Sequence, residues 1–261
     1  MKFLIVGDVV GKSGVERLES DLPRIIKEKN IDFCIVNGEN SANGKGLRVK
    51  EYDKIKLYGA DVITMGNHIY YRKEMAEEYI KYPDLLIPAN ITNLNGNHNI
   101  VIERNNKKIG VINLIGKAEM GEILEKNTSD PFKKIIEQID EVNKKGADYI
   151  FLDFHAEATA EKIAMGYYLT GKVTCVFGTH THVQTADEKI LDSKTAYITD
   201  VGMTGPIDSV IGLKKEVALK RFVEGVYAKY ECSENKACFN GIIVTTNDET
   251  NRPTSIERIS M

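Results

Sequence analysis

Short apolar runs alternate along the chain with segments whose apolar residues recur at helical spacing. The strand-like runs cover residues 3–7, 33–38, 62–66, 149–154 and 173–177. Helical spacing appears at residues 15–26, 132–142, 158–169 and 214–223. Strands that alternate with helices in this way are typical of layered α/β folds.

Two of the expected helices carry boundary signals. Ser13, with Glu16 three residues later, has the form of a capping box and predicts a helix start. Pro23 should break that helix because proline lacks a backbone N–H, so we expect two short helices. Asp130 and Pro131 have the form of an N-cap followed by an N1 proline. The helix that they open would have an apolar face made of Phe132, Ile135, Ile136, Ile139 and Val142.

The middle of the chain and its last third contain further strand signals. Residues 100–102 and 109–112 are apolar and flank the polar segment 104–108, which predicts a β-hairpin. Strand-like runs follow at residues 196–199, 241–246 and 255–260. Hairpins combined with alternating helices and strands favour an α/β fold with mixed sheets. No linker-like segment or internal repeat occurs, so we predict one domain over residues 1–261.

Polar residues of the metal-ligand or acid–base type follow five of the apolar runs. His180 and His182 would project to the same side of an extended chain. Carboxylates, imidazoles and amides gathered at one edge would suit two divalent cations that share a bridging carboxylate. The mixed nitrogen and oxygen donors favour iron, manganese or zinc over calcium. The residues are Asp8, Glu39, Asn40, Asn67, His68, His155, His180 and His182.

Composition narrows the function classes. The 261 residues carry a net charge of −3, which does not favour binding to duplex nucleic acid. No apolar stretch approaches the roughly 20 residues that span a bilayer, and the N-terminus lacks the apolar core of a signal peptide. We therefore expect a cytoplasmic protein without a membrane partner. Cys34 and Cys175 lie within apolar runs and should be buried, and Cys232 and Cys238 do not have zinc-ribbon spacing.

Each polar residue also has a structural interpretation when it is taken alone. His155 by itself is more often a packed residue than a ligand, and Asp8 or Asn40 could stabilise a turn. Only the whole set favours a metal site. His98 does not belong to this set of ligand-type residues and is interpreted as a solvated turn residue. The loop at 44–46 is interpreted as a flexible rim near the second ligand strand.

The same residues occur within short motifs that follow one another in a fixed order. In this order the motifs resemble those of the calcineurin-like metallophosphoesterases, and more narrowly the bacterial YmdB-type branch. Val10 and Glu39 stand where the broad superfamily has histidine and aspartate, and the YmdB-type branch is similar to this chain at both positions. The motifs are Gly7-Asp8, Gly38-Glu39-Asn40, Gly66-Asn67-His68, His155 and Gly178-Thr179-His180-Thr181-His182.

The resemblance implies a four-layer α-β-β-α sandwich of two mixed sheets and a cyclic-nucleotide phosphodiesterase with two iron or manganese ions. It implies attack on phosphorus by a metal-activated hydroxide, with His68 as the general acid and Asn67 also touching the phosphate. A 2′,3′-cyclic phosphate fits as the substrate. Glu39 would bridge the two metals. The first metal would be held by Asp8, Glu39, Asn40 and His182, and the second by Glu39, Asn67, His155 and His180.

The sequence leaves the substrate, the function class and the oligomeric state open. After His68 the chain has Ile69-Tyr70-Tyr71-Arg72, where the branch usually shows a Thr-Trp-Asp-like continuation, so substrate preference is not fixed. The same centre would serve a phosphomonoesterase or a protein phosphatase. A further alternative is a metal-bearing regulatory protein that acts through RNA-processing partners. A homo-oligomer is expected only by analogy with the family.

Overall fold

Two six-stranded sheets form the centre of the computed structural model, which describes residues 1–261 apart from the side chain of Ile123. The first sheet has the order β15 (Arg252–Ser260), β14 (Asn240–Asn247), β1 (Lys2–Val6), β3 (Phe33–Asn37), β4 (Val62–Thr64) and β5 (Leu85–Leu86). The second has the order β10 (Lys189–Leu191), β11 (Thr195–Ile198), β9 (Cys175–Thr179), β8 (Tyr149–His155), β7 (Lys107–Ile115) and β6 (Asn99–Arg104).

Both sheets are mixed, as the sequence predicts. In the first sheet β1, β3, β4 and β5 run parallel, whereas β14 pairs antiparallel with both β1 and β15. In the second sheet β7, β8, β9 and β11 run parallel, and the predicted hairpin forms the antiparallel pair β6 and β7. A small third sheet joins β13 (Ala237–Cys238), β12 (Met203–Pro206) and β2 (Asp8–Val9).

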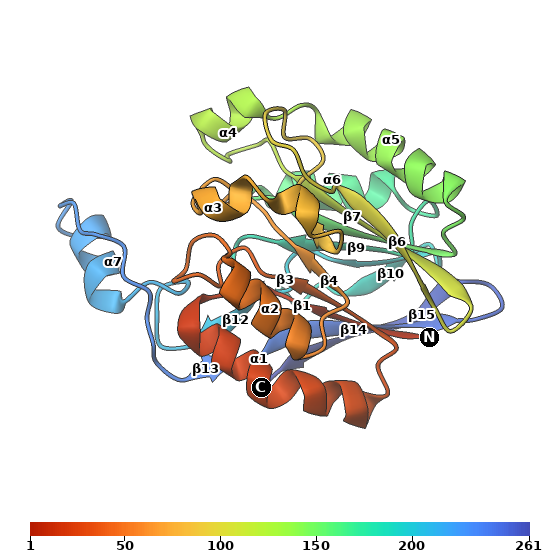
Figure 1. Ribbon diagram of the computed structural model, residues 1–261, viewed down its shortest axis with the longest axis horizontal. Coiled ribbons are helices and arrows are strands. Elements are labelled where there is room, and N and C mark those ends of the chain that lie inside the picture. The colour runs from red at the N-terminus through yellow and green to blue at the C-terminus, as the bar shows by residue number, and fades with distance from the viewer.

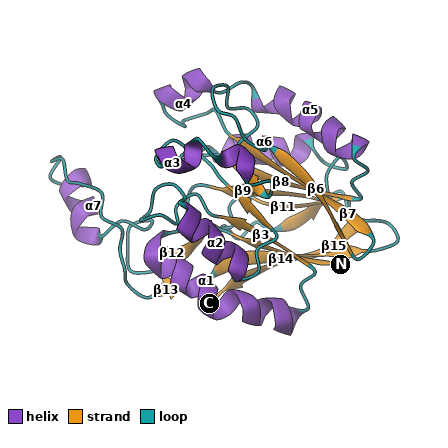
Figure 2. Ribbon diagram, in the orientation of Figure 1, coloured by secondary structure: helices purple, strands orange, loops and turns teal.

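Helices lie on the outer faces of the two large sheets. Figure 1 shows α1 and α2 on one side of the molecule, α5 and α6 on the other, and α7 on an arm that projects from the body; Figure 2 shows the strands between these helical layers. In the described part of the chain, no helix is long and apolar enough to cross a membrane. The helices are α1 (Gly11–Lys29), α2 (Val49–Leu57), α3 (Lys73–Ala76), η1 (Tyr79–Lys81), α4 (Glu122–Asn127), α5 (Pro131–Lys144), α6 (Thr159–Tyr168) and α7 (Lys215–Phe222).

Three apolar cores separate these layers. The central core lies between the sheets, where the rings of Phe3 and Phe151 have centroids 4.5 Å apart. An outer core packs Leu18 and Leu22 of α1 against the first sheet. The other outer core packs Ile135 of α5, with other side chains of α5 and α6, against the second sheet. This order of helix, sheet, sheet and helix is the order that the predicted sandwich requires.

Helix α1 corrects two predictions. It begins at Gly11, its N-cap Val10 makes no side-chain capping bond, and Ser13 lies buried inside the helix. The helix also runs through Pro23 without a break. Pro23 is exposed, so the carbonyl left without its helical donor faces solvent, and burial of the opposite apolar face outweighs the loss.

The other helix predictions are confirmed. Asp130 caps α5 by accepting hydrogen bonds from the backbone N–H groups of Phe132 and Lys133, and Pro131 is the first helical residue. Helices α6 and α7 begin and end within one residue of the predicted bounds. Cys34 and Cys175 are buried, and all four cysteines are free thiols. The single domain, the cytoplasmic location and the homo-oligomer stay predictions.

Candidate metal centre

The carboxyl ends of five strands meet at one place, and each delivers the polar residue that the sequence singled out. Asp8, Glu39, Asn40, Asn67 and His68 come from the ends of β1, β3 and β4 in the first sheet. The three remaining residues come from the second sheet, where His155 ends β8 and His180 and His182 follow β9. The structure therefore brings all eight predicted site residues together across the sheet interface.

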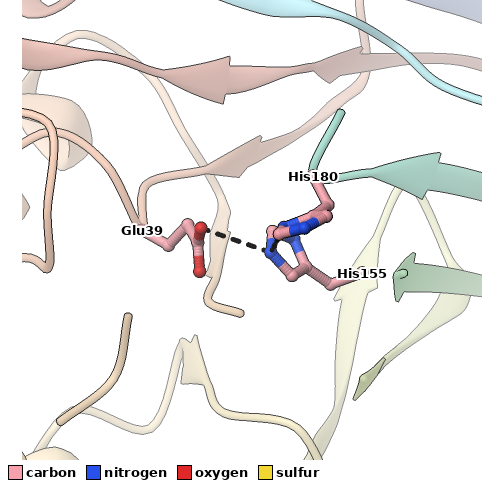
Figure 3. A group of neighbouring side chains, drawn as sticks. All are labelled: Glu39, His155 and His180. Atoms are coloured by element: carbon pink, nitrogen blue, oxygen red, sulfur yellow. Dashed lines mark hydrogen bonds and ion pairs between the residues drawn. The ribbon is translucent and has the colours of Figure 1, made fainter. Parts of the chain in front are cut away.

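Four ligand-type side chains converge in one half of the site. His155 Nε2 lies 2.8 Å from Asn67 Oδ1 and 3.2 Å from Glu39 Oε1. His180 Nδ1 lies 3.0 Å from His155 Nε2 and 3.1 Å from the same amide oxygen of Asn67. Figure 3 shows Glu39, His155 and His180 pointing toward one another. Lone-pair atoms gathered this closely suit a shared cation.

The other half of the site is built around Asn40. Its Nδ2 lies 3.0 Å from His182 Nε2, 3.4 Å from Asp8 Oδ1 and 3.1 Å from Glu39 Oε1. His182 Nε2 in turn lies 3.7 Å from Asp8 Oδ1. Glu39 thus touches both halves, which is the position that a bridging carboxylate requires.

Outer hydrogen bonds orient three of the four histidines of the site, His155, His180 and His182. In each ring one nitrogen faces the cluster and the other faces a second partner, which fixes the orientation of the ring. The sequence analysis gave none of these partners a role, because only the fold shows which groups reach the outer nitrogens of the rings. They are Thr179 Oγ1, 2.8 Å from His155 Nδ1; Glu157 Oε2, 2.9 Å from His180 Nε2; and the carbonyl of Ile211, 2.9 Å from His182 Nδ1.

The backbone that carries His180 and His182 differs from the prediction. Both residues have positive φ, at 99° and 66°, so the segment is not extended. Strain of this kind persists only where the surroundings impose it. Here the carboxylate of Asp200 accepts hydrogen bonds from the backbone N–H and the hydroxyl of Thr181, and it forms a buried ion pair with Lys162 at 2.7 Å. The buried ion pair therefore anchors the residue between the two histidines.

Burial shapes the electrostatics of the site. It raises the pKa of Asp8. Burial has the same tendency at Glu39, but His155 and His68 outweigh it and hold the pKa of Glu39 well below its usual range. Burial opposes charge on His155, yet Glu39 and Asp8 raise its pKa to about 9. Two buried carboxylates thus depend on nearby positive charge, which is the condition that bound cations satisfy.

The amide of Asn40 tests whether these residues fit metal ions. Its Oδ1 is buried without a hydrogen-bond partner among the described residues, while its Nδ2 faces Asp8, Glu39 and His182. Rotating the amide by half a turn exchanges the two atoms without moving the rest of the side chain. The orphaned oxygen would then face the same three groups as a ligand. The donor set therefore fits divalent transition metals.

Close packing around the cluster explains why residue 66 is a glycine. A Cβ added at Gly66 would overlap both Glu39 Oε2 and the ring of His155. His68, two residues later, has its Nδ1 3.1 Å from Glu39 Oε1, and its ring meets Tyr71 edge-on with centroids 5.0 Å apart. The departure from the family pattern at residues 69–72 therefore places a tyrosine beside the predicted acid.

A cavity of about 390 Å³ opens over the cluster. Asn67, His68 and His180 line it, and so do Gly44 and Lys45 of the loop at 44–46; the flexible rim stays a prediction. His98 lies outside this cavity. It is half-buried, with Nδ1 3.2 Å from the carbonyl of Ile87, so its interpretation as a solvated residue is wrong.

Comparison with known proteins decides the family. A family model described as YmdB-like protein matches residues 4–259. The chain belongs to the YmdB-like family. A member from Bacillus subtilis (strain 168), named 2′,3′-cyclic-nucleotide 2′-phosphodiesterase, is 42% identical over 260 residues, which are 99% of this chain and 96% of that protein.

Solved structures support the same family assignment. The structure described as a novel phosphatase from Mycoplasma pneumoniae has a TM-score of 0.92 and 38% identity, covering 100% of this chain and 93% of that one. A hypothetical protein from Thermus thermophilus has a TM-score of 0.91 and 32% identity, covering 100% of this chain and 99% of that one. The YmdB-like fold therefore extends over the whole chain, and the family resemblance drawn from the motifs is confirmed.

Proposed function

We propose that this YmdB-like protein is a binuclear metal-dependent phosphodiesterase that hydrolyses 2′,3′-cyclic nucleotides. The observation that carries the proposal is the two-part cluster around Glu39, which opens into a cavity with His68 at its side. The activity named for the Bacillus subtilis relative supports the substrate class. Hydrolysis of one of the two ester bonds of a 2′,3′-cyclic phosphate opens the ring and gives a monophosphate, which can leave through the cavity.

The ligand assignment follows the two halves of the cluster. We assign Asp8, Asn40 and His182 to one ion and Asn67, His155 and His180 to the other, with Glu39 as the bridge. Iron or manganese is our first choice, and zinc suits the same donors. When bound, such a pair lowers the pKa of a shared water and neutralises charge on the phosphate.

His68 is assigned as the general acid. It is partly exposed to the cavity, its backbone N–H donates to Glu39 Oε2 at 3.2 Å, and its Nδ1 faces Glu39 Oε1. These contacts hold the ring at the cluster and leave Nε2 as the nitrogen that we assign to protonate the leaving ribose oxygen. Asn67 lines the same cavity and is assigned a second contact, to the phosphate.

The alternative is a phosphomonoesterase with the same centre. The description of the Mycoplasma pneumoniae relative as a phosphatase favours it. The two activities differ in the number of ester bonds on the phosphorus that is attacked, so they are separated by comparing the diester 2′,3′-cyclic nucleotide with the monoester p-nitrophenyl phosphate.

The test uses metal-reconstituted wild type, His68→Ala and the control His98→Ala, which changes a histidine outside the site. We expect wild type and His98→Ala to hydrolyse 2′,3′-cyclic AMP, and His68→Ala to lose about 10²- to 10⁴-fold in kcat while it binds the same amount of manganese. Absence of turnover in wild type loaded with two equivalents of iron, manganese or zinc would contradict the proposed activity. Preference for p-nitrophenyl phosphate would favour the monoesterase.

A further inference from the structure

A tight turn beside the metal centre contains an unusual residue. Val210 and Leu213 exchange both backbone hydrogen bonds at 2.9 Å, and the two residues between them, Ile211 and Gly212, have φ of 47° and 96°. Two successive positive φ angles are the pattern of a type I′ turn, whose first position favours asparagine, aspartate or glycine. A β-branched residue in this conformation is a strained outlier.

The backbone of Ile211 has a role, but its side chain is not needed for that role. Its carbonyl accepts a hydrogen bond from His182 Nδ1 at 2.9 Å and so orients the ring. Any residue at this position would supply the same carbonyl. The isoleucine side chain is 53% exposed and lines the cavity over the cluster. Neither the turn nor the hydrogen bond accounts for a strained, exposed, branched apolar side chain at this place.

Other apolar side chains line the same side of the cavity. Val210, Leu213, Phe222 and Tyr230 join Ile211 there, and Phe222 is 80% exposed at the end of α7. Arg221 lines the cavity as well, and Glu39, Asn67, His68 and His180 of the cluster are also part of its lining. A cavity of about 390 Å³ with both apolar and phosphate-reactive groups in its lining fits a substrate whose phosphate is attached to a flat apolar group.

The loop opposite the turn is shaped to bring Tyr230 to the cavity. A Cβ added at Gly44, which has φ of 79°, would overlap the ring of Tyr230. Lys45 Nζ then lies 4.9 Å from the ring centroid of Tyr230 and 4.8 Å from that of Tyr71. Lys45 therefore ties the arm that carries Tyr230 to the loop that follows His68, and it closes one edge of the cavity.

We propose that Ile211, with Val210, Phe222 and Tyr230, forms the nucleobase subsite of this centre, and that Ile211 determines its preference for a nucleotide over a ribose phosphate without a base. This inference rests on the proposed hydrolysis of cyclic nucleotides. The base lies against the apolar wall while its phosphate reaches the cluster. Contact with a base face does not depend on hydrogen bonds to the base edge, so the subsite accepts all four bases with similar affinity.

Ile211→Asn distinguishes a role of the side chain in the subsite from a role in the turn. Asparagine suits the type I′ position and keeps the carbonyl that orients His182, but it removes the apolar side chain. We expect Tm to rise and manganese affinity to stay unchanged. For 2′,3′-cyclic AMP we expect KM to rise about tenfold with kcat retained. For the methyl riboside 2′,3′-cyclic phosphate, which lacks a base, kcat/KM should not change.

Two further variants keep the test sharp. Phe222→Ala, on the same wall, should raise KM for the nucleotide alone. Leu219 lies on the same helix, is 56% exposed and does not line the cavity. Leu219→Asn should therefore leave KM and kcat unchanged for both substrates. The proposed subsite would be overturned if Ile211→Asn lowered kcat/KM equally for both substrates. It would also be overturned if Ile211→Asn lowered kcat/KM for neither substrate. A lower Tm together with weaker manganese binding would overturn it as well, because the side chain would then serve the turn.

Failure of the proposed function has a different signature. Metal-loaded wild type would then hydrolyse neither substrate. The subsite would be tested by calorimetric binding of adenosine 3′-monophosphate and of the corresponding methyl riboside 3′-phosphate. Tighter binding of the adenosine compound to wild type, with the difference lost in Ile211→Asn, supports the subsite. Equal binding of the two compounds to wild type overturns it.

Discussion

Asn40 occupies the part of the site where the broad superfamily places a histidine on another strand. In this chain that position is Val10, whose side chain is buried and packs against Gly205 and Gly212. Val10 therefore supports the turn that orients His182 and contributes no ligand. The amide of Asn40 is the group that remains between Asp8 and His182, and its buried Oδ1 has no other partner among the described residues.

Removing this amide should weaken metal binding without unfolding the protein. We expect Asn40→Ala to bind manganese about 10- to 100-fold more weakly than wild type, in a competition titration with a chelator. The matched control is Asn113→Ala, because Asn113 is also buried with an unpaired Oδ1 but lies outside the cluster. Unchanged manganese affinity in Asn40→Ala would show that Asn40 is a structural residue of the turn.

Sequence reasoning found every residue that the cluster brings together, because each follows an apolar strand and belongs to a chemically distinct type. It missed the partners of the histidine rings. Glu157 and Ile211 were given no role, because only the fold shows that they touch His180 and His182. It also missed the positive φ of the two histidines, since nothing in their side chains distinguishes a strained backbone from an extended one.

At the scale of elements, helix α1 shows where a local rule yields to packing. Pro23 predicts a break, yet the helix continues because Leu18, Leu22 and Ile25 all bury on one face. The proline lies on the exposed face, where water can satisfy the unpaired carbonyl. Asp130 and Pro131 show the opposite case, in which a local capping signal and the tertiary structure agree.

Replacing this proline should stabilise the fold. Alanine is about 3 kcal/mol more favourable than proline inside a helix, and the greater freedom of the unfolded chain offsets about 1 kcal/mol of this. We expect Pro23→Ala to raise the free energy of unfolding by about 2 kcal/mol in urea denaturation. Lys27→Ala, an exposed change in the same helix, should stay within about 0.5 kcal/mol of wild type. A loss of stability in Pro23→Ala would mean that the ring makes contacts that alanine cannot replace.

At the scale of the whole molecule, the alternation of strands and helices predicted the α/β class, but it did not predict which strands are neighbours. Strand β1 lies between β3 and β14, and the pairing of Lys2 with Thr245 joins the two ends of the chain. Such contacts depend on the burial of whole sheet faces, which no local pattern encodes. The same topology places the site on the seam between the sheets.

Because of this position, metal binding should stabilise the fold. Asp8, Glu39 and Asn67 follow β1, β3 and β4 of the first sheet, whereas His155 ends β8 and His180 follows β9 of the second, so each ion would tie the two sheets together. Ligands that bind only the folded state stabilise it by about 2.7 kcal/mol at 100 times Kd. For a chain of this size we therefore expect manganese to raise Tm by about 5–10 °C and a chelator to reverse the rise.

The control for this prediction is a variant with one ligand removed from each sheet, Asn67→Ala combined with His155→Ala. We expect manganese to raise its Tm less than it raises that of wild type, because only the ion held by Asp8, Glu39, Asn40 and His182 keeps all its assigned ligands. Calcium, which prefers oxygen ligands, should shift the Tm of wild type less than manganese does. If the double variant responded to manganese as wild type does, the stabilising ion would have to lie elsewhere, because two of the four assigned ligands of one ion would be missing.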